Sequence, residues 1–494
     1  MKKLFLAAFI FCTYTIIFSI YEIDPLCHPD SIRYLNFANF LQNHNFIEGD
    51  LSGQQGLLFT PLFLPIAHNL LNFLFKTPFT FNGYILQMLS LLGILIMIFK
   101  LTEITADKKT AIFALTLLLI DMPFVMRSRI ILTEYPFVFF NLAIIFLYIK
   151  PKTLDFKTGL FVFILGFITT SVRTQAIVIF ILLIIYAACF DKKLLRFVLF
   201  ILAGSLAYGI LHLSLFNHLN SLYPNLLTLN EDLSLRIFIL GDKAFDYSYT
   251  IAGIQALALP FAEVLSTMNF ISYLRTIGEN LNSYREVGLQ NNLPQILLIL
   301  IFCWSAFKAK IRHKSLFIFI VLGNLAMLTL GLVPEYNFLR YNSLAYPLAI
   351  IIIAAFFSKQ TVNLRTNYVF FILISFYSLY LITNTYNNYK FFGLIKNNSE
   401  IVSNRVSCAI SKAIQASVGK KQNILCVKTY YYGTVYRSGN NPKYFNQYWS
   451  KEEIIDYISK VKSAAILATN EEIAFLEKKV ADWNAIGIKV LSFP

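Results

Sequence analysis

Long apolar runs separated by short polar loops make up most of this 494-residue chain. A helix that crosses a bilayer needs about 20 mainly apolar residues. Eleven runs approach this length and character: 4–20, 82–100, 110–126, 131–149, 158–173, 174–190, 195–216, 294–307, 315–333, 342–357 and 367–384. The pattern predicts a polytopic α-helical membrane protein with about eleven transmembrane helices.

Two other apolar stretches fit a transmembrane span less well. In residues 57–76, prolines and polar residues recur on one helical face, which favours a helix lying in the membrane interface. These residues are Pro61, Pro65, His68, Asn69, Asn72 and Lys76. The stretch 251–265 is short and contains Pro260 and Glu263, so we expect an interfacial or re-entrant segment there.

Basic residues mark alternate loops, as the positive-inside rule requires of cytoplasmic loops. The loops assigned to the inside contain Lys100, Lys108 and Lys109; Lys150, Lys152 and Lys157; Lys192, Lys193 and Arg196; Lys308, Lys310, Arg312 and Lys314; and Lys359 and Arg365. This assignment makes residues 4–20 a retained signal anchor with a cytoplasmic N-terminus, and an odd number of spans places the C-terminus outside. Residues 1–384 then form a transmembrane domain with outer loops 21–81 and 217–293.

The tail, residues 385–494, changes to an alternation of strands and helices. Strands are predicted at 423–427, 464–468 and 488–493, and capping boxes at 450–453 and 469–472 open two helices. We therefore predict a small extracytoplasmic α/β domain. Its two cysteines, Cys408 and Cys426, either pair in an oxidising compartment or remain as two thiols.

Composition supports the membrane assignment, with 57% hydrophobic and 14% charged residues. The net charge of +15 comes largely from lysines in the short loops, so we read it as an orientation signal and expect no nucleic-acid partner. The chain has no P-loop, GxSxG, HExxH or dinucleotide-binding motif.

Ionisable residues of the predicted spans gather at their outer ends, at Asp121, Arg127, Arg129, Glu134 and Arg173. The outer segments use arginine, whose planar fork of donors matches phosphate oxygens. We infer an outward-facing site for a phosphorylated lipid headgroup. The alternative for each arginine is a structural role, either snorkelling or pairing with Asp121 or Glu134.

The first outer loop opens a helix at Pro29-Asp30-Ser31, predicted to run to about Gln42. Asp30, Arg33 and Tyr34 lie within about one turn of one another at its entrance. Asp30 either caps this helix or acts chemically.

Three motifs resemble those of GT-C membrane glycosyltransferases, in particular the bacterial aminoarabinose transferases of lipid A and the protein O-mannosyltransferases. Pro29-Asp30-Ser31-Ile32-Arg33-Tyr34, followed by Ala38 and Leu41, is similar to the family's first-loop motif P-D-E-x-R-Y-x-x-x-A-x-x-L. Thr133-Glu134-Tyr135-Pro136 resembles its acidic motif, and the run from Leu339 to Pro347 resembles its R-Y-x-x-x-x-x-P motif. Ser31 departs from the family's usual glutamate.

The resemblance implies an inverting glycosyltransferase that takes a sugar from a polyprenyl-phosphate donor to a lipid, glycan or protein acceptor on the outer face of a bacterial inner (plasma) membrane. Asp30 would be the catalytic base. The leaving phosphate would be held by Arg340, Tyr341, Arg127, Arg129 and Arg173, with Arg33, Tyr34 and Glu134 in support.

Several alternatives stay open at this point. A lipid-linked glycan transporter or flippase would need internal repeats and a polar path at mid-depth, and an O-antigen-type polymerase would depend on a large outer loop. A divalent metal is a further possibility, although His28, Asp30 and His44 match no standard metal-binding spacing. The sequence identifies neither the sugar, the acceptor nor the oligomeric state.

Overall fold

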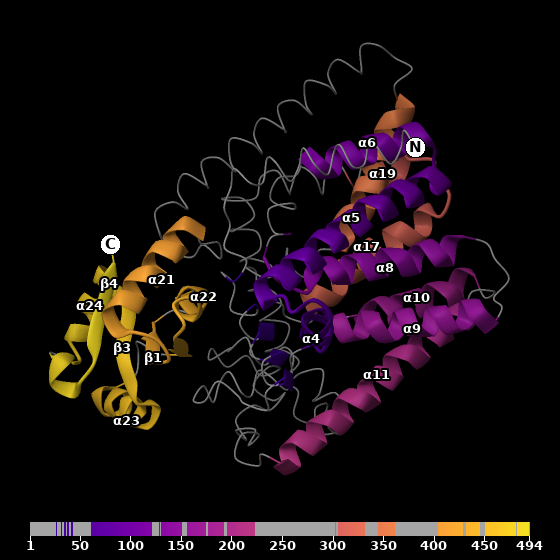
Figure 1. The fold of residues 1–494 in the computed structure, drawn as a ribbon. Coiled ribbons are helices and arrows are strands. Elements are labelled where there is room, and N and C mark those ends of the chain that lie inside the picture. Colours follow the sequence, from indigo (N-terminus) through magenta and orange to yellow (C-terminus); the bar gives the residue numbers. More distant parts are fainter. Residues whose placement is uncertain are drawn as a thin grey trace, which may run out of the picture.

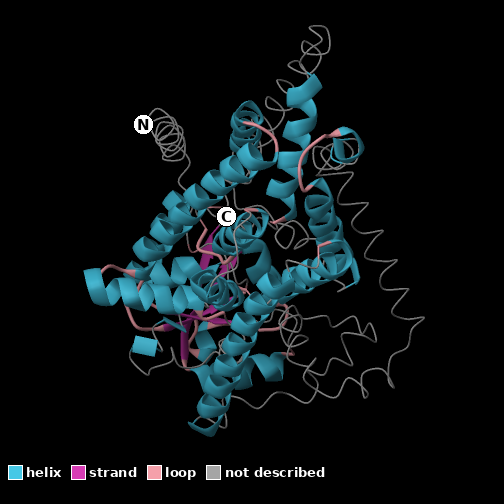
Figure 2. Ribbon diagram, turned by 90° about the vertical axis from the view of Figure 1, so that its right-hand side faces the viewer, coloured by secondary structure: helices cyan, strands magenta, loops and turns pink. Residues whose placement is uncertain are grey.

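We describe the protein from a computed structural model. It describes residues 26, 31, 34, 35, 37, 38, 41, 42, 61–120, 128, 130–150, 156–173, 176–191, 195–222, 302, 305–330, 344–360, 404–427, 431–444, 450–480 and 482–493. Most of these residues are helical, and the strands gather in one place (Figure 2).

The long helices of residues 63–360 form a bundle (Figure 1). They are α4 (Phe63–Phe75), α5 (Phe79–Thr105), α6 (Lys108–Ile120), α8 (Glu134–Ile149), α9 (Phe156–Val172), α10 (Ala176–Phe190), α11 (Leu195–Leu222), α17 (Lys314–Leu330) and α19 (Ala345–Gln360). Each of these helices from α5 to α19 overlaps one of the predicted spans. The predicted spans 4–20 and 367–384, and most of 294–307, lie outside the described residues.

Fewer transmembrane helices are identified from helix length in the structure than from the apolar pattern of the sequence. Among the described residues, two helical segments are long and apolar enough to cross a membrane, Phe79–Thr105 and Leu195–His212. Six more apolar helices are 10–17 residues long. The number of spans therefore stays a prediction, as does the side of the membrane that each end faces.

Polar contacts join the predicted inner loops at one end of the bundle. The backbone N–H of Arg312 donates to the Thr105 carbonyl at 3.0 Å. Thr110 and Ser358 share a hydroxyl hydrogen bond of 2.6 Å, as do Tyr186 and Ser315 at 2.8 Å. The predicted alternation of the loops between two ends thus agrees with the packing of the helices.

Helix α19 is buried on all sides, because every residue from Leu348 to Phe356 is at most 8% exposed. It packs against α5, α6 and α17. Its C-terminal end contacts the start of α6 through Ser358 and Thr110, so its N-terminal end is directed to the opposite end of the bundle.

Helices α9 and α11 approach each other most closely at glycines. A Cβ on Gly204 would lie 2.0 Å from the Phe163 carbonyl oxygen, and one on Gly166 would lie 2.3 Å from that of Ile201. Thr170 and Ser205 hydrogen-bond beside them. Small residues let membrane helices pack where no hydrophobic force drives them together.

The tail forms a four-stranded parallel sheet of order β2-β1-β3-β4. Its elements are α21 (Asn404–Val418), β1 (Asn423–Cys426), α22 (Tyr432–Arg437), β2 (Asn441–Tyr444), α23 (Lys451–Val461), β3 (Ser463–Thr469), α24 (Asn470–Glu477), the 3₁₀ helix η5 (Asn484–Ile486) and β4 (Lys489–Phe493). Side chains alternate across the sheet: Leu425 and Ile466 join one core cluster, and Ile424 and Leu467 join the other.

The three predicted strands and the two predicted helices of the tail correspond to β1, β3, β4, α23 and α24. The capping box of α24 is present, with the Thr469 N–H donating to Glu472 Oε2 at 2.8 Å. The sequence analysis missed β2, which contains Pro442 and is an edge strand, where proline is tolerated. It also missed α21 and α22.

Cys408 and Cys426 are not bonded to each other. The Cys408 sulfur accepts a hydrogen bond from Arg437 Nη1 at 3.4 Å. Cys426 is buried within β1, where its thiol donates to the Ile424 carbonyl at 3.7 Å. The structure therefore corresponds to the alternative of two thiols.

We expect Gly204→Ala to destabilise the protein by about 1–3 kcal/mol, because the new methyl group meets backbone that cannot move aside cheaply. Gly209→Ala on the same helix is the matched control, since its Cβ would have no heavy atom within 4 Å. The thermal unfolding midpoint of the detergent-solubilised protein measures both. Equal midpoints for the two variants would contradict the importance of this approach.

Candidate functional site

The segment that precedes α8, residues 130–133, is the meeting point of several elements at the end of the bundle opposite the basic loops. It is buried and is not helical before Glu134. Its backbone carbonyls therefore need partners from elsewhere in the chain. We call it the pre-α8 segment.

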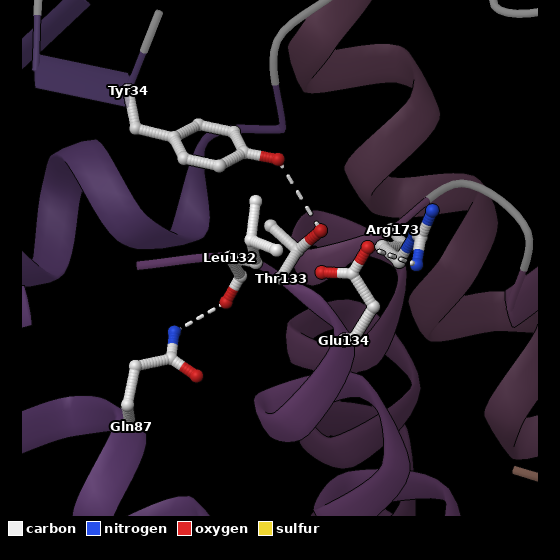
Figure 3. A network of polar contacts seen from close by, with 6 residues as sticks. All are labelled: Tyr34, Gln87, Leu132, Thr133, Glu134 and Arg173. Atoms are coloured by element: carbon white, nitrogen blue, oxygen red, sulfur yellow. Dashed lines mark hydrogen bonds and ion pairs between the residues drawn. The ribbon is translucent and has the colours of Figure 1, made fainter. Parts of the chain in front are cut away.

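Side chains from two distant elements supply these partners. The Ser31 hydroxyl donates to the Ile131 carbonyl at 2.8 Å, and Gln87 Nε2 of α5 donates to the Leu132 carbonyl. Figure 3 shows Gln87 reaching Leu132 from one side while Tyr34 reaches Thr133 from the other. The first-loop helix and α5 are thus fixed to the same short stretch of backbone.

The first-loop helix is present at each of its described residues between Ser31 and Gln42, as predicted. Tyr34 is 5% exposed, and its hydroxyl lies 3.3 Å from Thr133 Oγ1. Ala38 accepts a hydrogen bond from Asn69 of α4 at 3.2 Å. The helix is therefore held between the pre-α8 segment and α4.

An ion pair lies at the start of α8. Arg173 Nη1 at the end of α9 is 3.3 Å from Glu134 Oε1, and both residues are at most 7% exposed (Figure 3). The guanidinium also lies over the Phe137 ring, 5.9 Å from its centroid. Pro136 fits in the first turn of α8, where a backbone N–H has no partner within the helix.

This ion pair matches the structural alternative considered for the outer arginines. Glu134 compensates the charge of Arg173, so we expect Arg173 to contribute less to phosphate binding than an arginine with no acidic neighbour. Its role towards a phosphate stays a prediction, and so does that of Glu134.

Helix α4 is amphipathic, but Pro65 and His68 of the predicted polar face lie against the protein together with Leu64, and Lys76 of that face is exposed. Pro65 and His68 are buried, while Ile66, Leu70, Phe73, Leu74 and Phe75 are 51–82% exposed. Asn82 Nδ2 lies 3.0 Å from His68 Nδ1, so the neutral imidazole accepts a hydrogen bond there. Burial lowers the pKa of His68 to about 4, so the ring is neutral near pH 7.

Several predicted site residues lie outside the described residues: Asp30, Arg33, Arg127, Arg129, Arg340 and Tyr341, together with Asp121, His28 and His44. Parts of their motifs are described. Ser31 and Tyr34 belong to the motif of Asp30, and Leu344 to Pro347 complete the motif of Arg340. No group of three or more His, Cys, Asp or Glu side chains is arranged to hold a metal ion within the described part of the chain.

Ser31 and Gln87 are site-organising residues that the sequence analysis missed. Ser31 was noted as a departure from the family's glutamate, and its hydrogen bond to Ile131 spans 100 residues of sequence. Gln87 was one polar residue in a predicted span. The one sequence signal that could have identified Gln87 is a side-chain amide within an apolar helix, and the structure shows that this amide is buried.

No family model matches this chain, and no curated protein sequence matches it. Among solved structures it is similar to the oligosaccharyltransferase of Archaeoglobus fulgidus in a complex with zinc and sulfate, at 13% identity and a TM-score of 0.49, over 96% of this chain and 64% of that one. The apo form of that protein gives 10% identity and a TM-score of 0.46, over 93% and 68% of the two chains.

This chain spans less than two thirds of the length of the first of these structures. At such identities and TM-scores the likeness carries no argument about the fold or activity of this chain.

Replacing Arg173 by Gln should destabilise the protein by about 3–5 kcal/mol, because the buried Glu134 carboxylate loses its counter-charge. We expect Glu134→Gln combined with Arg173→Gln to cost less than the sum of the two single changes. Unfolding free energies for the wild type and all three variants complete this double-mutant cycle. Simple additivity would show that the pair contributes no coupling.

Stability should fall as the pH decreases from about 6.5 to about 4. In this window the unfolded chain binds a proton at His68 that the folded chain excludes, so stability rises with pH and its loss is complete only below about pH 4. Across this pH window the excluded proton lowers the free energy of unfolding by about 3 kcal/mol. His68→Gln keeps an acceptor for Asn82 and should show a flatter stability profile than the wild type in denaturant titrations; parallel profiles would contradict the assignment.

Proposed function

We propose that this chain is a GT-C-type membrane glycosyltransferase that moves a sugar, with inversion, from a polyprenyl-phosphate donor to an acceptor at the outer face of the membrane. The observation that carries the proposal is the attachment of the first-loop helix to the pre-α8 segment through Ser31 and Tyr34. It brings two of the three motifs to one end of the bundle.

The motif of Arg340 leads to the same end of the bundle. Leu344 is fully buried and Ala345 begins α19, whose N-terminal end points away from the basic loops. Arg340 precedes Leu344 by four residues, and Asp30 directly precedes Ser31. The chain connections therefore favour a common location for a carboxylate and a guanidinium.

These two groups suffice for an inverting transfer. Asp30 takes the proton of the acceptor hydroxyl or amine as that group attacks C1 of the sugar. The bond from C1 to the phosphate oxygen breaks, and the phosphate leaves with its electron pair. Arg340, with Arg127 and Arg129, stabilises the charge that develops on the phosphate, while Tyr341 donates a hydrogen bond to it.

The donor must enter from the membrane. A polyprenyl chain would lie among the apolar helices with its phosphate at their outer ends, and α4, with its apolar face exposed, would cover this region from the interface. We further propose a location in the bacterial inner membrane, with residues 1–384 as the catalytic domain and residues 385–494 as an extracytoplasmic domain. The metal requirement stays open.

Asp30→Asn should abolish sugar transfer, with a loss of about 10²–10⁴-fold in rate, because the acceptor is no longer deprotonated. Arg340→Ala should lose about 10²–10³-fold. Purified protein would be assayed with a panel of polyprenyl-phosphate sugars carrying mannose, glucose or aminoarabinose, and release of the polyprenyl phosphate would be followed by mass spectrometry.

Binding of undecaprenyl phosphate separates the two roles. Arg340→Ala should weaken it, whereas Asp30→Asn should leave it unchanged. Asp107→Asn and Arg312→Ala are matched controls at the other end of the bundle, where Asp107 caps the Thr110 N–H at 2.8 Å. Unimpaired transfer by Asp30→Asn would refute the proposed base, and lipid movement without transfer would favour the flippase.

A further inference from the structure

Helix α22 in the tail contacts the first outer loop backbone to backbone. A Cβ on Gly433 would lie 2.3 Å from the Leu26 carbonyl oxygen and 3.0 Å from its carbonyl carbon. Both atoms belong to the main chain of the loop, so a rotamer change cannot relieve the overlap. Only glycine fits at position 433 without a shift of the loop or the helix.

A continuous apolar core surrounds this contact. Leu26 is 1% exposed and shares a cluster with Tyr431 and Val435, which flank Gly433. The same cluster contains Tyr34 and Leu35 of the first-loop helix. The first outer loop therefore packs against α22 as part of one core.

On its other side, α22 is attached to α21 of the tail. Thr434 Oγ1 lies 3.0 Å from Ser407 Oγ of α21, and both residues are buried. Figure 1 shows α22 on the side of the C-terminal unit that faces the helical bundle. The loop thus has two anchors, one at Leu26 on α22 and one at Ser31 on the Ile131 carbonyl.

We propose that α22 is a docking surface for the first outer loop and that Gly433 is a positioning residue of the transfer reaction. Three residues lie between Leu26 and Asp30, and Ser31 follows directly. The tail then fixes the N-terminal side of the segment that carries the base, while the bundle fixes its C-terminal side. This inference rests on the proposed function as far as the role of Asp30 is concerned.

A general base must remain within hydrogen-bond reach of the proton it takes. A displacement of about 1 Å can cost about 10²-fold in rate. A side chain at position 433 pushes Leu26 away from α22, whereas the proposed phosphate-binding arginines belong to other segments of the chain. The rate should therefore suffer more than donor binding.

The test compares Gly433→Ala and Gly433→Val with Gly209→Ala and Gly209→Val in the full-length protein. Gly209 is also a helical glycine, and a Cβ there would meet nothing within 4 Å. We expect kcat to fall at least about tenfold for Gly433→Ala and further for Gly433→Val, with the donor KM within about twofold of the controls. Affinity for undecaprenyl phosphate should be unchanged.

Amide hydrogen exchange tests the docking of the first outer loop without an assay of sugar transfer. Amides of residues 31–42 should exchange at least about tenfold faster in Gly433→Val than in Gly209→Val, while those of α8 remain unaffected. Should the valine variant fail to fold, the alanine variant provides the same comparison.

The outcomes distinguish this inference from the proposed function. Unchanged exchange and unchanged kcat in both Gly433 variants would overturn the docking surface, even if the wild type transfers sugar. Faster exchange without any transfer by the wild type would support the docking surface and refute the glycosyltransferase. Faster exchange with an unaltered kcat would overturn the positioning role of Gly433.

Discussion

The need to satisfy a short stretch of buried, non-helical backbone organises one end of this protein. Residues 130–133, directly before α8, are not helical, and the carbonyls of Ile131 and Leu132 accept hydrogen bonds from Ser31 and Gln87. A buried carbonyl without a partner is costly, and more so where lipid replaces water. The pre-α8 segment therefore draws the first outer loop and α5 to the same place. The hydrogen bond from Ser31 therefore determines at which end of the bundle the motif of Asp30 lies.

The fold could be predicted from the sequence as far as local patterns determine it. Apolar runs indicated α5 to α19, and capping boxes indicated α23 and α24, because these signals lie within one element. The contacts that assemble the site were not predictable in this way. The bond from Ser31 to Ile131 joins residues 100 positions apart, and Gly433 meets Leu26 across most of the chain. The pairing of Glu134 with Arg173 was open to sequence reasoning as one alternative, because two opposite charges at neighbouring span ends tend to meet.

Helix α4 shows why an amphipathic pattern does not fix orientation. The sequence identifies which residues share a face, and the structure turns the face with Pro65 and His68 inward. In water the polar face of such a helix points to solvent. Ala38 and Asn82 provide hydrogen-bond partners for Asn69 and His68 of this helix. The large apolar side chains of Ile66, Leu70, Phe73, Leu74 and Phe75 are left exposed. This arrangement is stable where the surroundings are apolar.

Glycine lets two segments of backbone approach closely in two parts of the structure. Within the bundle, Gly204 admits the Phe163 carbonyl, and between the tail and the first outer loop, Gly433 admits that of Leu26. We expect the two contacts to have different consequences, because α9 and α11 are long helices that pack along each other, whereas Leu26 meets the short helix α22. A methyl group added at Gly204 would force α9 and α11 apart and lower the stability of the whole bundle. We infer that the same addition at Gly433 would displace the loop, so that a contact of the same kind would govern stability in one place and the position of the proposed catalytic segment in the other.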